Sequence, residues 1–143
     1  MKKYIYIING PNLNFIGKRE IKIYGNKSFN CFYKKLKNKY KKNIKLKYFQ
    51  TNSESKIINK LYKLNKKNIY GILLNAAAYS HTSLSILDCI KSIKIPVIEI
   101  HISNIYKREK IRNISLISKN CKGIIVGFGL LSYDIALYYF CNK

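Results

Sequence analysis

Residues 71–83, GILLNAAAYSHTS, decide the fold of this chain. The run 71–74 is apolar without alternation, which is typical of a strand that is covered on both faces in a parallel sheet. Asn75, a run of alanines and His81 follow it, and residues 82–92 then carry a helical pattern. A buried strand, a polar turn and a helix in this order form the repeating unit of an α/β fold.

The same order recurs along the chain. Strands are predicted at 4–8, 46–50, 71–74, 97–100 and 123–126, and helices at 28–42, 53–66, 82–92, 107–113 and 131–140, with Ser53 and Thr82 as N-caps. We therefore expect a flavodoxin-like α/β fold, a doubly wound parallel five-stranded sheet with helices on both faces. The length of 143 residues, with no linker or repeat, predicts a single domain, 1–143.

The chain is strongly basic, with 28 Lys and Arg against 6 Asp and Glu and a formal net charge of +22. Such a charge ordinarily favours nucleic-acid binding. However, the lysines are scattered along every segment, and arginine, the preferred reader of phosphates and bases, is almost absent from the lysine-rich stretches. We interpret the composition as that of an AT-rich coding sequence and expect no nucleic-acid partner. A lysine-driven nucleic-acid binder is the alternative.

The cysteine spacing and the hydropathy of the chain argue against a zinc site, a disulfide framework and a membrane-spanning segment. The four cysteines form no Cys-x-x-Cys pair, so neither a zinc site nor a disulfide framework is indicated. Every apolar run is too short to cross a bilayer, and the first is also too short for a signal peptide. We expect a soluble, cytoplasmic protein with no membrane partner.

The chemically distinctive residues follow the predicted strands. Residues 9–12, 50–52, 75–81 and 101–104 come after the first four strands, and all the histidines, arginines and acids except Asp134 lie in or beside such segments. Open α/β sheets bind ligands beyond the carboxyl ends of their strands. The sequence therefore predicts one polar site at this edge of the sheet. A flavin or phosphate binder is a further alternative, although residues 9–14 lack the glycine- and hydroxyl-rich cradle that it needs.

Glu99 and His101 are the best candidates for acid–base chemistry. They are two residues apart in a predicted strand, so their side chains share a face. A carboxylate beside an imidazole fixes its tautomer and favours its protonated, proton-donating form. On spacing alone, a strand-end histidine that a neighbouring acid merely satisfies is an equally good interpretation.

Several post-strand residues could bind an anionic, hydroxylated ligand. Backbone donors at Ile102 and Ser103 could bind a carboxylate, and Asn75 and His81 could hydrogen-bond hydroxyls. Two arginines, Arg108 and Arg112, would share one face of the predicted helix at 107–113 and could clamp substrate oxygens. An ordinary turn, a helix cap and solvated surface charges are the corresponding structural alternatives.

Residues 17–25, GKREIKIYG, form a polar segment bounded by glycines that could close over a site. Within it, the Arg19 guanidinium could favour the phenolate form of Tyr24, which would make the phenol a usable base. Since the chain contains 13 tyrosines, residue type alone makes Tyr24 a surface or packing residue.

Together these segments resemble the type II 3-dehydroquinate dehydratases. The matching blocks run in family order: 8–14, 17–20 with 24–25, 50–54, 75–83 with 88, 99–104, 108–109 with 112, and 123–129 with 133. The resemblance implies a reversible anti elimination of water from 3-dehydroquinate to 3-dehydroshikimate. It further implies an enolate intermediate, no cofactor, no metal and a place in the shikimate pathway to chorismate and the aromatic amino acids.

The resemblance also implies a role for each matching residue. Tyr24 would be the base, Arg19 would lower its pKa, Asn12 would hold a water against the enolate, and His101 paired with Glu99 would protonate the leaving hydroxyl. The substrate-binding residues would be Asn75, His81, Asp88, Ile102, Ser103 and Arg112. Asp88 would reach a neighbouring subunit's site in a homododecamer built of trimers.

The chain departs from the family pattern at three places. Ile21 stands where a proline is common, Ser55 replaces a usual glycine, and Ala76-Ala77 stands where Pro-Gly or Ala-Gly is typical. None of these changes removes a proposed catalytic group, so we expect them to affect lid and turn geometry only.

Overall fold

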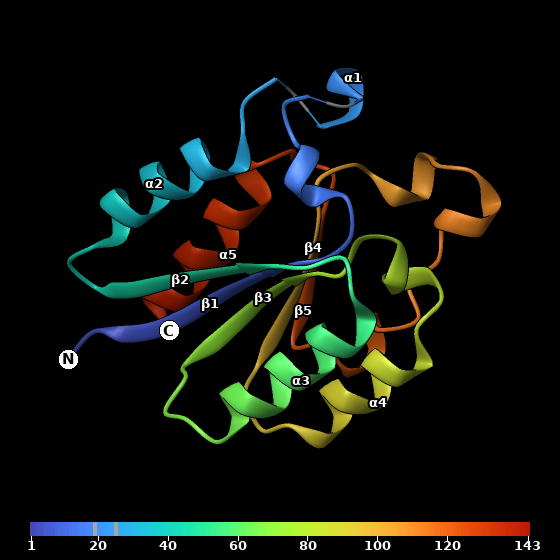
Figure 1. Cartoon of the computed structure of the whole chain (residues 1–143). Helices are drawn as coiled ribbons and strands as arrows, with labels where there is room; N and C mark the ends of the chain where they lie inside the picture. Colours follow the sequence, from blue (N-terminus) through green and yellow to red (C-terminus); the bar gives the residue numbers. More distant parts are fainter. Residues whose placement is uncertain (19, 25) are drawn as a thin grey trace.

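The computed structural model describes residues 1–18, 20–24 and 26–143, with 23 and 24 described by their backbone alone. Its centre is a parallel sheet of β1 (Lys3–Asn9), β2 (Ile44–Gln50), β3 (Gly71–Asn75), β4 (Val97–His101) and β5 (Gly123–Val126) (Figure 1). The strand order is β2-β1-β3-β4-β5, so the direction of winding reverses between β1 and β3. The predicted parallel five-stranded sheet is confirmed.

Helices cover both faces of the sheet, as predicted (Figure 1). One face carries α2 (Phe29–Tyr40) and α5 (Leu131–Asn142), and the other carries α3 (Glu54–Asn65) and α4 (Leu84–Ser92). Short elements complete the chain: α1 (Ile21–Tyr24), η1 (Leu13–Phe15), η2 (Ala77–His81), η3 (Ile105–Lys107), η4 (Lys110–Arg112) and η5 (Ser118–Asn120). None of the helices among the described residues combines the length and apolar character needed to cross a membrane.

The apolar strands divide their side chains between two cores. In β3, Leu73 packs in the core under α2 and α5, whereas Ile72 and Leu74 pack in the core under α3 and α4. In β1, Ile7 and Ile8 are divided in the same way. Because successive side chains point to opposite faces and both faces are covered, these runs need no polar positions.

The prediction that Thr82 caps a helix is wrong. Residues up to His81 form η2, so α4 begins only at Leu84 and its N-cap is Ser83, whose hydroxyl oxygen accepts the Ile86 N–H at 2.9 Å. The predicted cap at Ser53 is confirmed, since its hydroxyl oxygen accepts the Lys56 N–H.

The predicted helix at 107–113 is also wrong. This stretch holds the end of η3 and all of η4, which are single 3-10 turns, and Arg108 is extended between them. No residue of η4 is buried and Ile111 is exposed, so the stretch has no apolar face that could stabilise a longer helix. Arg108 and Arg112 therefore do not share a helix face.

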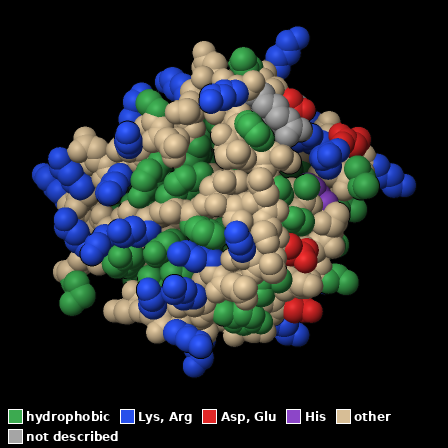
Figure 2. Space-filling view, in the orientation of Figure 1, with side chains coloured by type: hydrophobic (Ala, Val, Ile, Leu, Met, Phe, Trp, Pro, Cys, Tyr) green, Lys and Arg blue, Asp and Glu red, His purple; other side chains and the backbone are tan. Residues whose placement is uncertain are grey.

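Figure 2 shows the basic side chains dispersed over the visible face among polar and apolar ones. The acidic side chains visible there lie towards one side, around a histidine. This distribution agrees with the interpretation of the lysines as scattered charges and of the acids as part of one polar region.

The Gly71→Ala substitution should destabilise the fold. A Cβ at Gly71 would overlap the ring of Phe140, which is fully buried, so the ring or the strand must shift. We expect the free energy of unfolding, measured in urea at fixed protein concentration, to fall by about 1–3 kcal/mol. Gly123→Ala is the control, because a Cβ there meets nothing within 4 Å; equal losses in both variants would contradict this explanation.

Candidate active site

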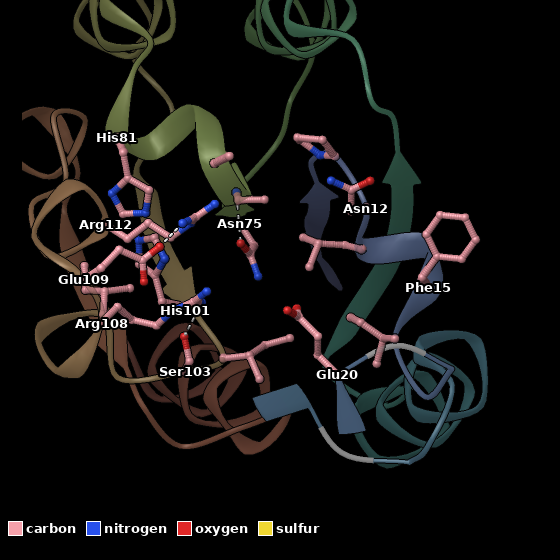
Figure 3. Close-up of a pocket in the computed structure, with 17 residues that line it drawn as sticks. Asn12, Phe15, Glu20, Asn75, His81, His101, Ser103, Arg108, Glu109 and Arg112 are labelled. Carbon is pink, nitrogen blue, oxygen red and sulfur yellow. Dashed lines mark hydrogen bonds and ion pairs between the residues drawn. The ribbon is translucent and has the colours of Figure 1, made fainter. Parts of the chain in front are cut away.

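A pocket of about 350 Å³ lies beyond the carboxyl ends of the central strands, at the point where the strand order reverses (Figure 3). Asn12 and Phe15 lie on one side of it, the two histidines and two arginines lie on the other, and Asn75 projects between them. Most of the predicted site residues line this pocket: Asn12, Asn75, His81, His101, Ile102, Ser103 and Arg112.

Glu99 and His101 form a buried pair in β4. Glu99 Oε2 lies 2.5 Å from His101 Nε2, and the two residues are 0% and 5% exposed. Since a carboxylate only accepts, Nε2 carries the proton in this contact, and Nδ1 is left for a proton that can be exchanged with a ligand. Glu99 thus supports the imidazole from behind, while His101 lines the pocket.

Serine hydroxyls complete the surroundings of Glu99. Ser115 Oγ donates to Oε1 at 2.9 Å, and Ser118 Oγ lies 2.9 Å from Oε1 and 3.2 Å from Oε2. Sequence reasoning missed both serines, because neither directly follows a strand. Their spacing carries no signal that distinguishes them from surface serines.

Asn75 is fixed by a buried network at the end of β3. Its Oδ1 accepts the Ala77 N–H at 3.1 Å, and its Nδ2 donates to the Tyr133 hydroxyl at 3.0 Å. That hydroxyl in turn donates to Asn9 Oδ1 at 2.7 Å, which joins the ends of β1 and β3 to α5. Burial raises the pKa of Tyr133, so the hydroxyl stays protonated and remains a donor. Asn75 keeps one N–H for a ligand.

His81 is also held in one orientation. Its Nδ1 lies 2.6 Å from the Ile114 carbonyl oxygen, so Nδ1 carries the proton and Nε2 of the neutral ring is an acceptor. The rings of His81 and His101 have centroids 6.0 Å apart. The two imidazoles therefore act on neighbouring parts of one pocket.

The turn after β1 is supported by the turns after β2 and β3. Asn12 has a φ of 67°, a left-handed conformation that asparagine tolerates, and its N–H donates to Asn52 Oδ1 at 3.0 Å. Tyr79 Oη donates to the Asn52 carbonyl at 2.7 Å. A Cβ at Gly10 would lie 2.7 Å from the Ala76 carbonyl oxygen, so only glycine allows this approach of the two turns.

Charged side chains surround the pocket mouth. Arg108, Glu109, Arg112 and Glu20 line it. Arg112 pairs with Glu109, and Arg108 Nη1 donates to Ser103 Oγ at 3.3 Å. The tertiary structure therefore brings both arginines to the pocket although they lie on separate short turns. Glu20 was not predicted to bind a ligand.

Of the three other predicted site residues, Asp88, Arg19 and Tyr24, only Asp88 has a described side chain, and it does not line this pocket. Asp88 is exposed on α4. Arg19 and the side chain of Tyr24 lie outside the described residues, and the backbone of Tyr24 ends α1. Within residues 1–18, 20–24 and 26–143, no group of three or more His, Cys, Asp or Glu side chains is placed to hold a metal ion.

The fold and the pocket define an α/β enzyme that combines a buried acid–base pair with cationic and amide groups for an anionic substrate. Residues 3–141 match the model of the family described as dehydroquinase class II. The 3-dehydroquinate dehydratase of Clostridium botulinum (strain Hall) is 47% identical over 140 residues, which cover 97% of this chain and 95% of the relative. The enzyme of that name from Caldicellulosiruptor saccharolyticus is 48% identical over 139 residues, covering 96% and 95%.

Solved structures agree with this assignment. The type II dehydroquinase from Butyrivibrio crossotus has a TM-score of 0.95 and 40% identity, covering 99% of both chains. The type II dehydroquinase from Propionibacterium acnes has a TM-score of 0.95 and 33% identity, covering 100% of this chain and 99% of that one. The chain belongs to the class II dehydroquinase family, which confirms the predicted flavodoxin-like α/β fold and the resemblance drawn from the sequence.

The Ala77→Gly substitution should stabilise the protein. Ala77 has a φ of 51°, a left-handed conformation that is unfavourable for alanine. It stands at the position where the resemblance to the family predicts a glycine. We expect the free energy of unfolding to rise by up to about 1 kcal/mol, because relief of strain exceeds the entropy that glycine adds to the unfolded chain.

Ala78→Gly is the matched control in the same turn, because Ala78 has no positive φ. It should lower the free energy of unfolding by about 0.5–1 kcal/mol. Destabilisation of the same size by Ala77→Gly, measured by the same urea titration, would contradict the strain.

Proposed function

We propose that the chain eliminates water from 3-dehydroquinate in this pocket, with the Glu99–His101 pair as the general acid. The activity is that of its family, and the expectation of a 3-dehydroquinate dehydratase, a lyase of the shikimate pathway, is confirmed by the family match and the relatives. The observation that carries the mechanism is the buried carboxylate 2.5 Å from an imidazole in the pocket wall.

The acid step follows from the contacts of His101. Hydroxide is a poor leaving group unless it is protonated as the C–O bond breaks. A doubly protonated His101 keeps its Nε2–H on Glu99 and gives the Nδ1 proton to the departing hydroxyl. The Glu99 carboxylate stabilises the imidazolium before this transfer, and its burial strengthens the attraction.

The base step is assigned by position. The ketone acidifies the adjacent C–H, Tyr24 as phenolate removes that proton, and Arg19 favours the phenolate by its charge. Asn12, whose backbone is held by Asn52, keeps a water beside the developing enolate oxygen. The support for these roles is the resemblance of 17–20 and 24–25 to the family blocks and the position of α1 in the chain between η1, which lines the pocket, and α2.

The substrate is bound by groups that the structure holds in fixed orientations. Asn75 and His81 bind hydroxyls, since each is oriented by a separate hydrogen bond. The backbone at Ile102 and Ser103, together with the guanidinium of Arg112, binds the carboxylate. These groups provide the binding energy that aligns the reacting carbons between base and acid. We expect no cofactor and no metal in this mechanism.

The assembly and location complete the proposal. We place residues 1–143 in a single cytoplasmic domain that assembles into a homododecamer of trimers. Asp88 would reach a neighbouring subunit's pocket, which is supported by its exposure on α4. Exposed apolar side chains on β5, α5 and the turn between them, Ile124, Phe128, Leu131 and Tyr138, support burial against other subunits.

The proposed acid and base are tested by turnover of 3-dehydroquinate, followed by the ultraviolet absorbance of the conjugated product. Tyr24→Phe and His101→Ala should each lower kcat by about 100-fold or more, because each removes a proton-transfer group. Tyr62→Phe, on the surface of α3, should leave kcat unchanged.

Each outcome addresses one part of the proposal. A folded wild-type protein that does not dehydrate 3-dehydroquinate would overturn the function. Full activity of Tyr24→Phe would overturn the assignment of the base alone, and full activity of His101→Ala would overturn that of the acid.

A further inference from the structure

We propose that Ser118, assisted by Ser115, is a positioning residue of the general acid: its hydroxyl holds the Glu99 carboxylate turned towards His101. The inference rests on the proposed function, since it concerns the acid of the same reaction. It extends the site by two residues behind the pocket wall, neither of which lines the pocket.

The first step of the argument is the cost of burying Glu99. A carboxylate with no solvent contact is strongly disfavoured in its charged form unless hydrogen bonds replace its lost hydration. Ser118 Oγ spans both carboxylate oxygens, at 2.9 and 3.2 Å, and Ser115 Oγ contacts Oε1 at 2.9 Å. These hydroxyls therefore supply the hydrogen bonds that an ionised Glu99 requires.

The second step is the division between the two oxygens. Oε1 accepts from both serines at 2.9 Å, whereas Oε2 lies 2.5 Å from the imidazole and makes a longer contact of 3.2 Å with Ser118. Hydroxyls stabilise a carboxylate without neutralising it, so the full negative charge remains available to the imidazolium. A lysine or arginine in their place would compete with His101 for the same charge.

The third step concerns the other titratable groups around the pair. Burial, and then the negative charge of Glu99, raise the pKa of the Cys121 thiol to about 12, so this neighbour stays uncharged. Among the residues that the structure describes, the titratable groups on the pocket side of the pair are His81 on η2 and, around the pocket mouth, Glu20, Arg108, Glu109 and Arg112. Ser115 and Ser118, both half-buried, thus contact Glu99 from outside the pocket lining, whereas the charged groups lie on the pocket side.

The fourth step is the rigidity of the segment 114–118. The Leu116 N–H donates to the Ser80 carbonyl at 2.7 Å, and Ile117 is fully buried in the core under α4. The Ile114 carbonyl holds His81 Nδ1. One short segment therefore orients both imidazoles of the pocket, directly for His81 and through Glu99 for His101.

The first experiment measures kcat, KM and their pH dependence for Ser118→Ala, Ser118→Thr and the double variant Ser115→Ala/Ser118→Ala. We expect Ser118→Ala to lower kcat by about 10-fold, the order of effect expected for a residue that orients a catalytic group without touching the substrate. KM should change by less than about 2-fold. Ser118→Thr keeps the hydroxyl and should restore most of kcat, and the double variant should lose more. Asn38→Ala, at an exposed position of α2 that does not line the pocket, is the control and should equal wild type.

The pH profile separates positioning from general damage. Without the hydroxyl, the carboxylate loses a hydrogen bond that turns it towards His101, so the imidazolium has a weaker counter-charge. The alkaline limb of the kcat profile should therefore move to lower pH. Ser118→Ala made in the Glu99→Gln background should have no further effect on kcat, because the hydroxyl acts through the carboxylate.

A second measurement needs no turnover. The chain has only two histidines, so the imidazole NMR signal of His101 can be assigned by comparison with His81→Gln. Its titration should move to lower pH in Ser118→Ala, in the same direction as in Glu99→Gln. An unchanged titration and kcat in folded Ser118→Ala, or an equal loss in Ser118→Thr, would overturn the inference. An inactive wild type whose His101 titration still responds to Ser118→Ala would instead overturn the proposed reaction.

Discussion

At the end of β4 a carboxylate that has no contact with solvent is held against an imidazole in the wall of the pocket. A buried charge is tolerated only where hydrogen bonds and an opposite charge replace water. Glu99 meets this requirement with two serine hydroxyls and His101, which are contributed by two separate segments of the chain. This arrangement fixes the imidazole of His101 in the pocket wall.

The parallel sheet makes such an arrangement possible. All five strands end at the same edge, and the reversal of winding between β1 and β3 opens a space there. The network Asn9–Tyr133–Asn75 ties the two strand ends on either side of this reversal to α5. The same contacts that join the layers of the fold therefore orient the Asn75 amide in the pocket wall.

Among the residues that the structure describes, the strained backbone conformations lie in the turns around the pocket. Asn12, Glu20 and Ala77 have positive φ and are not glycine, and each of them lines the pocket. Their conformations bring backbone donors and short side chains close to the ligand space. Asparagine tolerates this region well, whereas alanine does not, so the departure from the family pattern at Ala77 has a local cost in stability.

The sequence by itself determined the order of strands and helices and the edge at which the site lies. It did so because both are encoded locally, in apolar runs and in the residues that follow them. The shared face of Glu99 and His101 follows from their spacing in a strand. The family was identifiable from sequence segments that are spread along the whole chain. Only the tertiary structure decided that 107–113 forms short turns, and only it decided that Ser115, Ser118 and Tyr133 support the pocket. Those contacts join residues that are distant in sequence. Local patterns such as hydrophobic periodicity do not specify which distant segments will pack together on the two faces of the sheet.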